Sequence, residues 1–106
     1  MIITDDKAEK AFEFLLSSAK DYAQAKADEY HLEKFEKKLL AKLKNESSET
    51  TDAGKTRDAY NAPEYETWLN GYKEAVYKLS ELETRRDNAQ LAIDIWRTES
   101  ANQRRM

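Results

Sequence analysis

The chain has 106 residues and a net charge of −3, so it has room for one domain (1–106) and lacks the strongly basic character of a dedicated nucleic-acid-binding domain. It has no cysteine, which excludes disulfides, thiol catalysis and cysteine-ligated metals. Its 37% charged residues, two Gly and one Pro predict long helices with solvated faces, and no apolar run approaches the ~20 residues of a membrane span, so we expect a cytoplasmic protein without a membrane segment.

The first expected element is a helix at residues 5–44. Thr4 is a favourable N-cap, and Asp5 and Asp6 in the first turn complement the helix dipole. Around residues 26–30 the apolar repeat changes phase, which predicts a stutter there, or a kink or break as the alternative. The apolar positions on the two sides are Ala8, Phe12, Leu15, Ala19 and Tyr22, and then Leu32, Phe35, Leu39 and Leu43.

A polar connection follows at residues 45–60. Its first part, up to Thr51, has the composition of a loop. Residues 52–60 can form a short helical turn, although Gly54 weakens it.

The second long helix is expected at residues 62–100, and its start has the clearest local signal in the chain. Asn61 and Glu64 have the spacing of a capping box, and Pro63 falls in the first turn, where its missing N–H costs nothing. We therefore expect Asn61 to cap this helix. The basic tail at residues 101–106 is expected to fray.

The second helix carries a heptad seam. Its members recur at alternating steps of three and four for more than four heptads, so the strip must pack against another helix, in this chain or in a copy of it. Arg86 is the charged member, and it either pairs with an acid across the interface or turns its charge outward. The seam consists of Tyr65, Trp68, Tyr72, Ala75, Leu79, Leu82, Arg86, Ala89, Ile93 and Trp96, and it is widened by Leu69, Val76, Ala92 and Ile95.

The fold class that follows is all-α. Two long helices joined by a polar connection, with room in it for a short helix, form a long helical hairpin. One hairpin buries only one face of each helix. The chain has two Trp, six Tyr and three Phe, which is more apolar and aromatic surface than two helices can cover. We therefore expect a homo-oligomer.

Catalytic chemistry is not visible in the sequence. His31 is the only histidine, so the Glu-x-x-His pairs of a di-iron site and a serine triad both fail, and no Gly-rich phosphate loop is present. Asp28, Glu29 and Glu33 surround His31, which we expect to be solvated or at an interface. We expect no enzyme, no catalytic residue, no metal and no cofactor.

Cations concentrate at the end of the first helix. Lys34, Lys38 and Lys42 lie at i,i+4 steps on one face, where they can follow successive phosphates. The simpler interpretation is a solvated face whose lysines complement the helix dipole. The candidate nucleic-acid contacts, called the basic strip below, are Lys34, Lys37, Lys38, Lys42, Lys44 and Arg57.

Four tyrosines can stack on nucleobases if they are exposed, namely Tyr60, Tyr65, Tyr72 and Tyr77. Tyr65 and Tyr72 belong to the heptad seam, so packing is the better expectation for those two.

The basic strip resembles a pattern of the UvsY-like recombination mediators of T-even-type phages. That pattern is two lysines, three small or apolar residues, Lys, an apolar residue, and Lys or Arg, carried on a first helix before a polar connection and a second long helix. Here it reads Lys37-Lys38-Leu39-Leu40-Ala41-Lys42-Leu43-Lys44. The chain is also similar to a group of small phage-encoded proteins in two short elements. The first is Ala-Tyr-x-x-x-Glu-Tyr, here Ala59-Tyr60 with Glu64-Tyr65. The second is Trp-Arg-Ser/Thr near a basic end, here Trp96-Arg97-Thr98 before Arg104-Arg105.

The resemblance implies a ring-like homo-oligomer that binds single-stranded DNA and helps a RecA-like recombinase displace single-strand-binding protein, in the host cell cytoplasm. Lys42 and Lys44 would contact DNA, with Lys37 and Lys38 in support. The alternative is a non-catalytic structural or assembly protein, such as a virion component or chaperone, that binds partner helices through the heptad seam. A basic strip that faces a shared groove or central pore of the oligomer would favour the recombination mediator over the assembly protein.

Overall fold

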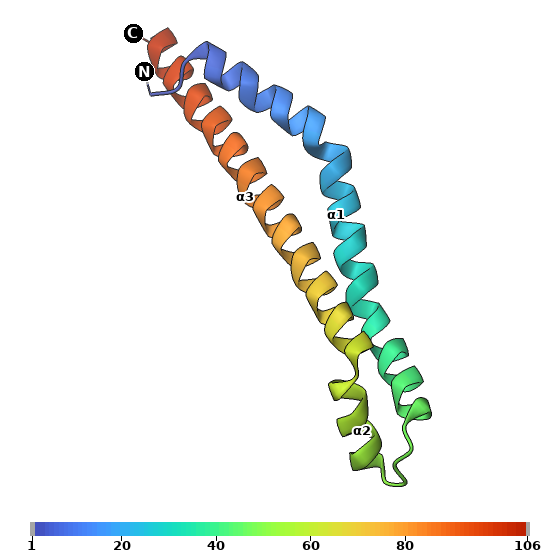
Figure 1. The fold of residues 1–106 in the computed structure, drawn as a ribbon. Helices are drawn as coiled ribbons and strands as arrows, with labels where there is room; N and C mark the ends of the chain where they lie inside the picture. Colours follow the sequence, from blue (N-terminus) through green and yellow to red (C-terminus); the bar gives the residue numbers. More distant parts are fainter. Residues whose placement is uncertain (1, 106) are drawn as a thin grey trace. The chain divides into compact units, whose positions relative to one another are not determined.

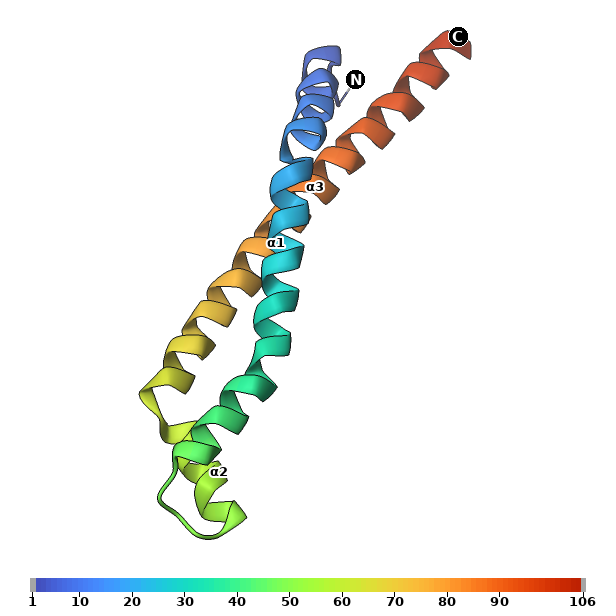
Figure 2. The ribbon, with the colours of Figure 1, turned by 90° about the vertical axis from the view of Figure 1, so that its right-hand side faces the viewer.

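The computed structural model describes residues 2–105, apart from the side chain of Arg105, and within them the chain is all-α, as predicted. In the described range, three helices follow one another, α1 (Asp5–Glu46), α2 (Asp52–Asn61) and α3 (Pro63–Arg105) (Figure 1). A loop at residues 47–51 leads from α1 into α2, as Figure 2 shows. Self-association remains a prediction.

The start of α1 follows the predicted cap. The Lys7 backbone N–H donates to Thr4 Oγ1 at 3.2 Å, and Asp5 and Asp6 occupy the first turn. The helix ends at Glu46 rather than at Lys44. Just after its end, the Ser47 backbone N–H donates to the Lys44 carbonyl at 3.2 Å. The short helical turn considered possible at residues 52–60 is present as the ten-residue helix α2, with Thr51 as its N-cap accepting from the Gly54 N–H at 3.0 Å.

The predicted cap of α3 is wrong. Asn61 is the last residue of α2, and Ala62, with φ −69° and ψ 141°, is the extended residue between α2 and α3. The cause is Pro63, because a proline disfavours helical backbone at the residue before it, so the break falls at Ala62. The Ala62 carbonyl then accepts from the Tyr65 N–H at 3.1 Å.

The predicted end of the second helix near Ser100 is also wrong, whereas fraying of the tail at residues 101–105 stays a prediction. They continue α3, which runs to Arg105 instead of ending near Ser100. Ala, Asn, Gln and Arg contain no helix breaker, so nothing in this stretch interrupts the backbone hydrogen bonds. Met106 lies outside the described residues.

The contacts divide the chain into two compact units. The terminal unit comprises the residues up to Gln24 and those from Leu79 onward, and the central unit comprises Ala25–Lys78. Antiparallel segments of α1 and α3 meet in each. The central unit also contains α2, and Ala59 of α2 joins the buried cluster of Leu39, Leu43 and Trp68.

The predicted change of heptad phase in α1 is wrong, because the inward positions alternate by three and four without a slip. Ser18, Glu29 and Glu36 occupy inward positions and conceal the repeat, whereas Phe12 and Phe35 are 42% and 37% exposed. α1 is one continuous helix, as predicted, so the alternative of a break near residues 26–30 does not hold. The inward residues, all buried or partly buried, are Ala8, Ala11, Leu15, Ser18, Tyr22, Ala25, Glu29, Leu32, Glu36, Leu39 and Leu43.

Candidate nucleic-acid interface

The lysines of the basic strip lie on α1 in the central unit, and all of them except Lys44 are on its exposed, outward side. Lys34, Lys37 and Lys38 are exposed, whereas their neighbours Glu36 and Leu39 turn toward α3. This division follows from helical spacing, because residues one or two positions from a buried seam point away from it. Lys42 is also exposed and Lys44 is partly buried, while Arg57 is exposed on α2.

Three lysines of the strip already have partners within the chain. Lys44 Nζ lies 2.9 Å from Asp52 Oδ1, and this hydrogen bond and the lysine charge lower the pKa of Asp52. Lys42 Nζ lies 3.9 Å from Glu46 Oε1. Lys34 Nζ lies 5.3 Å from the centre of the Tyr30 ring, in a cation–π contact.

The other three cations of the strip make no ion pair with the described part of the chain, and these are Lys37, Lys38 and Arg57. A phosphate can therefore contact Lys37 and Lys38 without displacing a carboxylate. The resemblance gives more weight to Lys42 and Lys44, but a phosphate there would compete with Glu46 and Asp52. The Lys44–Asp52 pair was not visible in the sequence, because Asp52 reaches Lys44 only across the loop, whereas Lys42 and Glu46 have the i,i+4 spacing of a pair on one helix.

Three cross-helix hydrogen bonds fix which face of α1 carries the lysines. Trp68 Nε1 donates to the Leu32 carbonyl at 2.8 Å. Tyr65 Oη donates to Glu36 Oε2 at 2.8 Å, and Tyr72 Oη donates to Glu29 Oε1 at 3.2 Å. Burial and then the bond to Glu36 raise the pKa of Tyr65 to about 12, so the phenol keeps its proton and remains a donor at neutral pH.

The heptad seam of α3 turns toward α1. Trp68 and Ile93 are 8% and 1% exposed. Of the four residues expected to widen the seam, two do not do so, because Leu69 is 47% exposed and Val76 is 38% exposed, whereas Ala92 and Ile95 are partly buried. The remaining seam residues are partly buried, namely Tyr65, Tyr72, Ala75, Leu79, Leu82, Arg86, Ala89 and Trp96.

Arg86 takes neither of the two expected arrangements. Its Nη1 donates to the Leu15 carbonyl at 2.9 Å and to Ser18 Oγ at 2.7 Å. The guanidinium carbon lies 4.9 Å from the centre of the Tyr22 ring, and Tyr22 Oη donates to Glu83 Oε1 at 3.1 Å. The charge thus points inward onto the backbone and hydroxyl of α1, which sequence spacing alone does not reveal.

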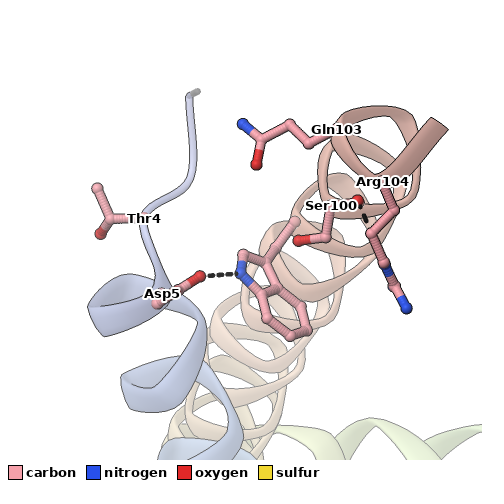
Figure 3. Close-up of a pocket in the computed structure, with 6 residues that line it drawn as sticks. Thr4, Asp5, Ser100, Gln103 and Arg104 are labelled. Carbon is pink, nitrogen blue, oxygen red and sulfur yellow. Dashed lines mark hydrogen bonds between the residues drawn. The ribbon is translucent and has the colours of Figure 1, made fainter. Parts of the chain in front are cut away.

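An open pocket of about 600 Å³ lies in the terminal unit, between the start of α1 and the end of α3 (Figure 3). Trp96 Nε1 donates to Asp5 Oδ1 at 2.7 Å on one side of it. Ser100, Gln103 and Arg104 line the other side, with Arg104 Nε donating to the Ser100 carbonyl at 3.5 Å. The one cation there that the structure describes, Arg104, lies far along the sequence from the basic strip.

His31 stacks on Phe35, with the ring centres 6.3 Å apart, and borders a second open pocket of about 410 Å³ in the central unit. Asp28, Glu74 and Lys78 also line it. Among residues 2–105, no group of three or more His, Asp or Glu side chains is arranged to hold a metal ion. The exposed side chains of Lys37, Lys38 and Arg57 are able to make electrostatic contacts with anions.

Comparisons with protein-family models, curated proteins and solved structures give no match. The resemblance to UvsY-like mediators therefore rests on the residues quoted for it. In the described part of the chain, no helix has an apolar stretch long enough to cross a membrane.

Proposed function

We propose that this chain is a non-catalytic recombination mediator of the UvsY-like kind, which binds single-stranded DNA along the basic strip and helps load a RecA-like recombinase in place of single-strand-binding protein. The observation that supports it is the pair Lys37 and Lys38, exposed on the outward face of α1 and free of ion pairs within residues 2–105. Both belong to the eight-residue pattern on which the resemblance rests.

Self-association is part of the proposal. One protomer carries a net charge of −3 and a short strip, so its own attraction for a polyanion is weak. Several linked strips bind one strand with a large gain from effective concentration. Large apolar side chains supply the surface for contacts between copies, and Leu16, Leu69 and Leu91 are 80%, 47% and 57% exposed.

A second candidate is an assembly protein that binds partner helices. The same exposed apolar residues favour it, and so do the internal partners of Lys42 and Lys44, which leave those lysines with a solubilising role. DNA binding separates the two functions, because an assembly protein of net acidic charge has no reason to bind a polyanion.

The test is fluorescence anisotropy of a labelled oligothymidylate titrated with the protein at about 50 and about 200 mM salt. We expect the double variant Lys37→Ala/Lys38→Ala to bind on the order of 10- to 100-fold more weakly at the lower salt. The slope of log affinity against log salt should fall by about 1.4 per protomer, because each phosphate contact with a single strand contributes about 0.7.

The matched control is Lys73→Ala/Lys78→Ala, which removes the same charge from exposed positions of α3 in the same unit. It should bind nearly as well as wild type. Lys42→Ala/Lys44→Ala should weaken DNA binding less than Lys37→Ala/Lys38→Ala does, because Lys42 and Lys44 are each paired with a carboxylate that offsets their charge. No binding by wild type at low salt, with assembly shown by light scattering, would exclude the mediator and favour the assembly protein.

A further inference from the structure

Four aromatic rings form a ladder in the central unit. Tyr60 meets Tyr65 edge to face, with ring centres 5.0 Å apart and planes at 70°. Tyr65 lies 5.4 Å from Trp68, and Trp68 stacks on Tyr72 at 5.3 Å. Trp68 is 8% exposed, whereas Tyr60 is 51% exposed, so the ladder leads from the core to a ring in solvent.

The inner rungs of the ladder are fixed. Trp68 is held by its bond to the Leu32 carbonyl, Tyr65 by its bond to Glu36, and Tyr72 by its bond to Glu29. Tyr60 therefore rests against a ring that is itself held in place. An aromatic side chain supported in this way loses little conformational freedom when a ligand stacks on it.

Tyr60, near the end of α2, lies close to the turns of α1 in which Lys37 and Lys38 occur. The residue before it, Ala59, is packed in the cluster with Leu39 and Leu43. The ring that it contacts, Tyr65, reaches Glu36. These contacts place Tyr60 near the inward side of α1 between Glu36 and Leu43, and Lys37 and Lys38 are exposed on the same stretch of that helix.

The other exposed tyrosines lack this combination. Tyr77 is 70% exposed but makes no ring contact with the described residues, so no neighbouring ring supports it. Tyr30 is 60% exposed, but the Lys34 ammonium lies over its ring at 5.3 Å. Tyr60 is both exposed and supported by a neighbouring ring.

We infer that Tyr60 is a stacking platform for an unpaired nucleobase of the strand whose phosphates contact Lys37 and Lys38. This inference rests on the proposed function and adds a base-contacting residue to it. Stacking on an aromatic ring tolerates any base, because every base has a π-face, and it requires that the base be unpaired. Tyr60 thus gives the site a preference for single strands that lysines alone do not provide.

The experiment compares oligothymidylate with an abasic oligonucleotide of the same length, whose backbone carries the same phosphates, using the full chain at one fixed salt concentration. Wild type should bind the thymidine strand more tightly. Tyr60→Ala should weaken that binding by about 5- to 150-fold and leave binding to the abasic strand and the salt slope unchanged. Tyr60→Phe keeps the ring and should retain wild-type binding, and Tyr77→Ala is the matched control.

The outcomes separate the two proposals. If wild type binds both strands equally, and Lys37→Ala/Lys38→Ala weakens both, the mediator proposal stands and the stacking inference is overturned. This comparison uses wild type, so it does not depend on the folding of the Tyr60 variants. If wild type binds neither strand, both proposals are overturned.

Discussion

Arg86 shows how a single charged side chain is accommodated at an inward position. A charge removed from water is costly unless it is hydrogen-bonded, and Arg86 finds the Leu15 carbonyl and Ser18 Oγ, with the Tyr22 ring beneath it. Ser18 is 6% exposed, so its hydroxyl depends on partners inside the protein. Arg86 therefore joins α3 to α1 by polar contacts at a position where an aliphatic residue would be expected.

We expect Arg86→Ala to lower the free energy of unfolding by about 1.5–3 kcal/mol, because it removes hydrogen bonds from a charged donor. Its neighbour supplies the control. Arg85 is exposed and lies over the Phe14 ring at 4.8 Å, so Arg85→Ala should cost less than about 1 kcal/mol. Urea unfolding followed by circular dichroism measures both, and equal losses would show that the inward contacts of Arg86 contribute nothing.

At the scale of the element, α3 was easier to predict than α1 for a physical reason. The inward positions of α3 are mostly aromatic or aliphatic, so the repeat is visible from hydrophobicity alone. Those of α1 include Ser18, Glu29 and Glu36, whose places are set by donors on the other helix, respectively Arg86, Tyr72 and Tyr65. A local pattern cannot contain this information. For the same reason the sequence predicted the lysines of the basic strip but not the Lys44–Asp52 ion pair, whose carboxylate lies on another helix.

The two helical glycines should respond in opposite directions to the same substitution. A Cβ at Gly71 of α3 would meet no atom within 4 Å, so Gly71→Ala should stabilise the protein by about 0.5–1 kcal/mol through helix propensity. A Cβ at Gly54 of α2 would lie 2.9 Å from Glu49 Cβ and 3.0 Å from Thr51 Oγ1, the capping atom. Gly54→Ala should therefore cost about 1–3 kcal/mol by overpacking. Thermal unfolding compares them, and a stabilising Gly54→Ala would show that the loop moves aside freely.

Over the whole molecule, tyrosine–glutamate hydrogen bonds between α1 and α3 occur in both units. Tyr22 bonds to Glu83 in the terminal unit, while Tyr65 and Tyr72 bond to glutamates of α1 in the central unit. The bond to Glu83 chiefly raises the pKa of Tyr22, and burial chiefly raises the pKa of Tyr72. Each phenol must keep its proton to donate, so these contacts depend on pH.

The pH dependence has a definite sign. The pKa of a tyrosine is about 10 in the unfolded chain and is raised in the folded one, so the folded state binds the proton more tightly. The stability that these tyrosines contribute is complete below pH ~10 and is lost as pH rises, for Tyr65 through about 12. Urea titrations at pH 9 and at higher pH should show falling stability.

The triple variant Tyr22→Phe/Tyr65→Phe/Tyr72→Phe should lose less stability than wild type over the same alkaline range. It retains every lysine, so it controls for lysine deprotonation. Equal losses in the two proteins would show that the tyrosines are not the groups responsible.

The two tryptophans lie in different units. Trp68 is buried beside Tyr72 in the central unit, and Trp96 donates to Asp5 in the terminal unit. Indole fluorescence reports on local surroundings, so the chain has a built-in optical probe in each unit. Replacing one Trp by Phe leaves an emission signal that follows a single unit during unfolding. Two superimposable melting curves would mean that the units open together, and two separated curves would define the order in which they open.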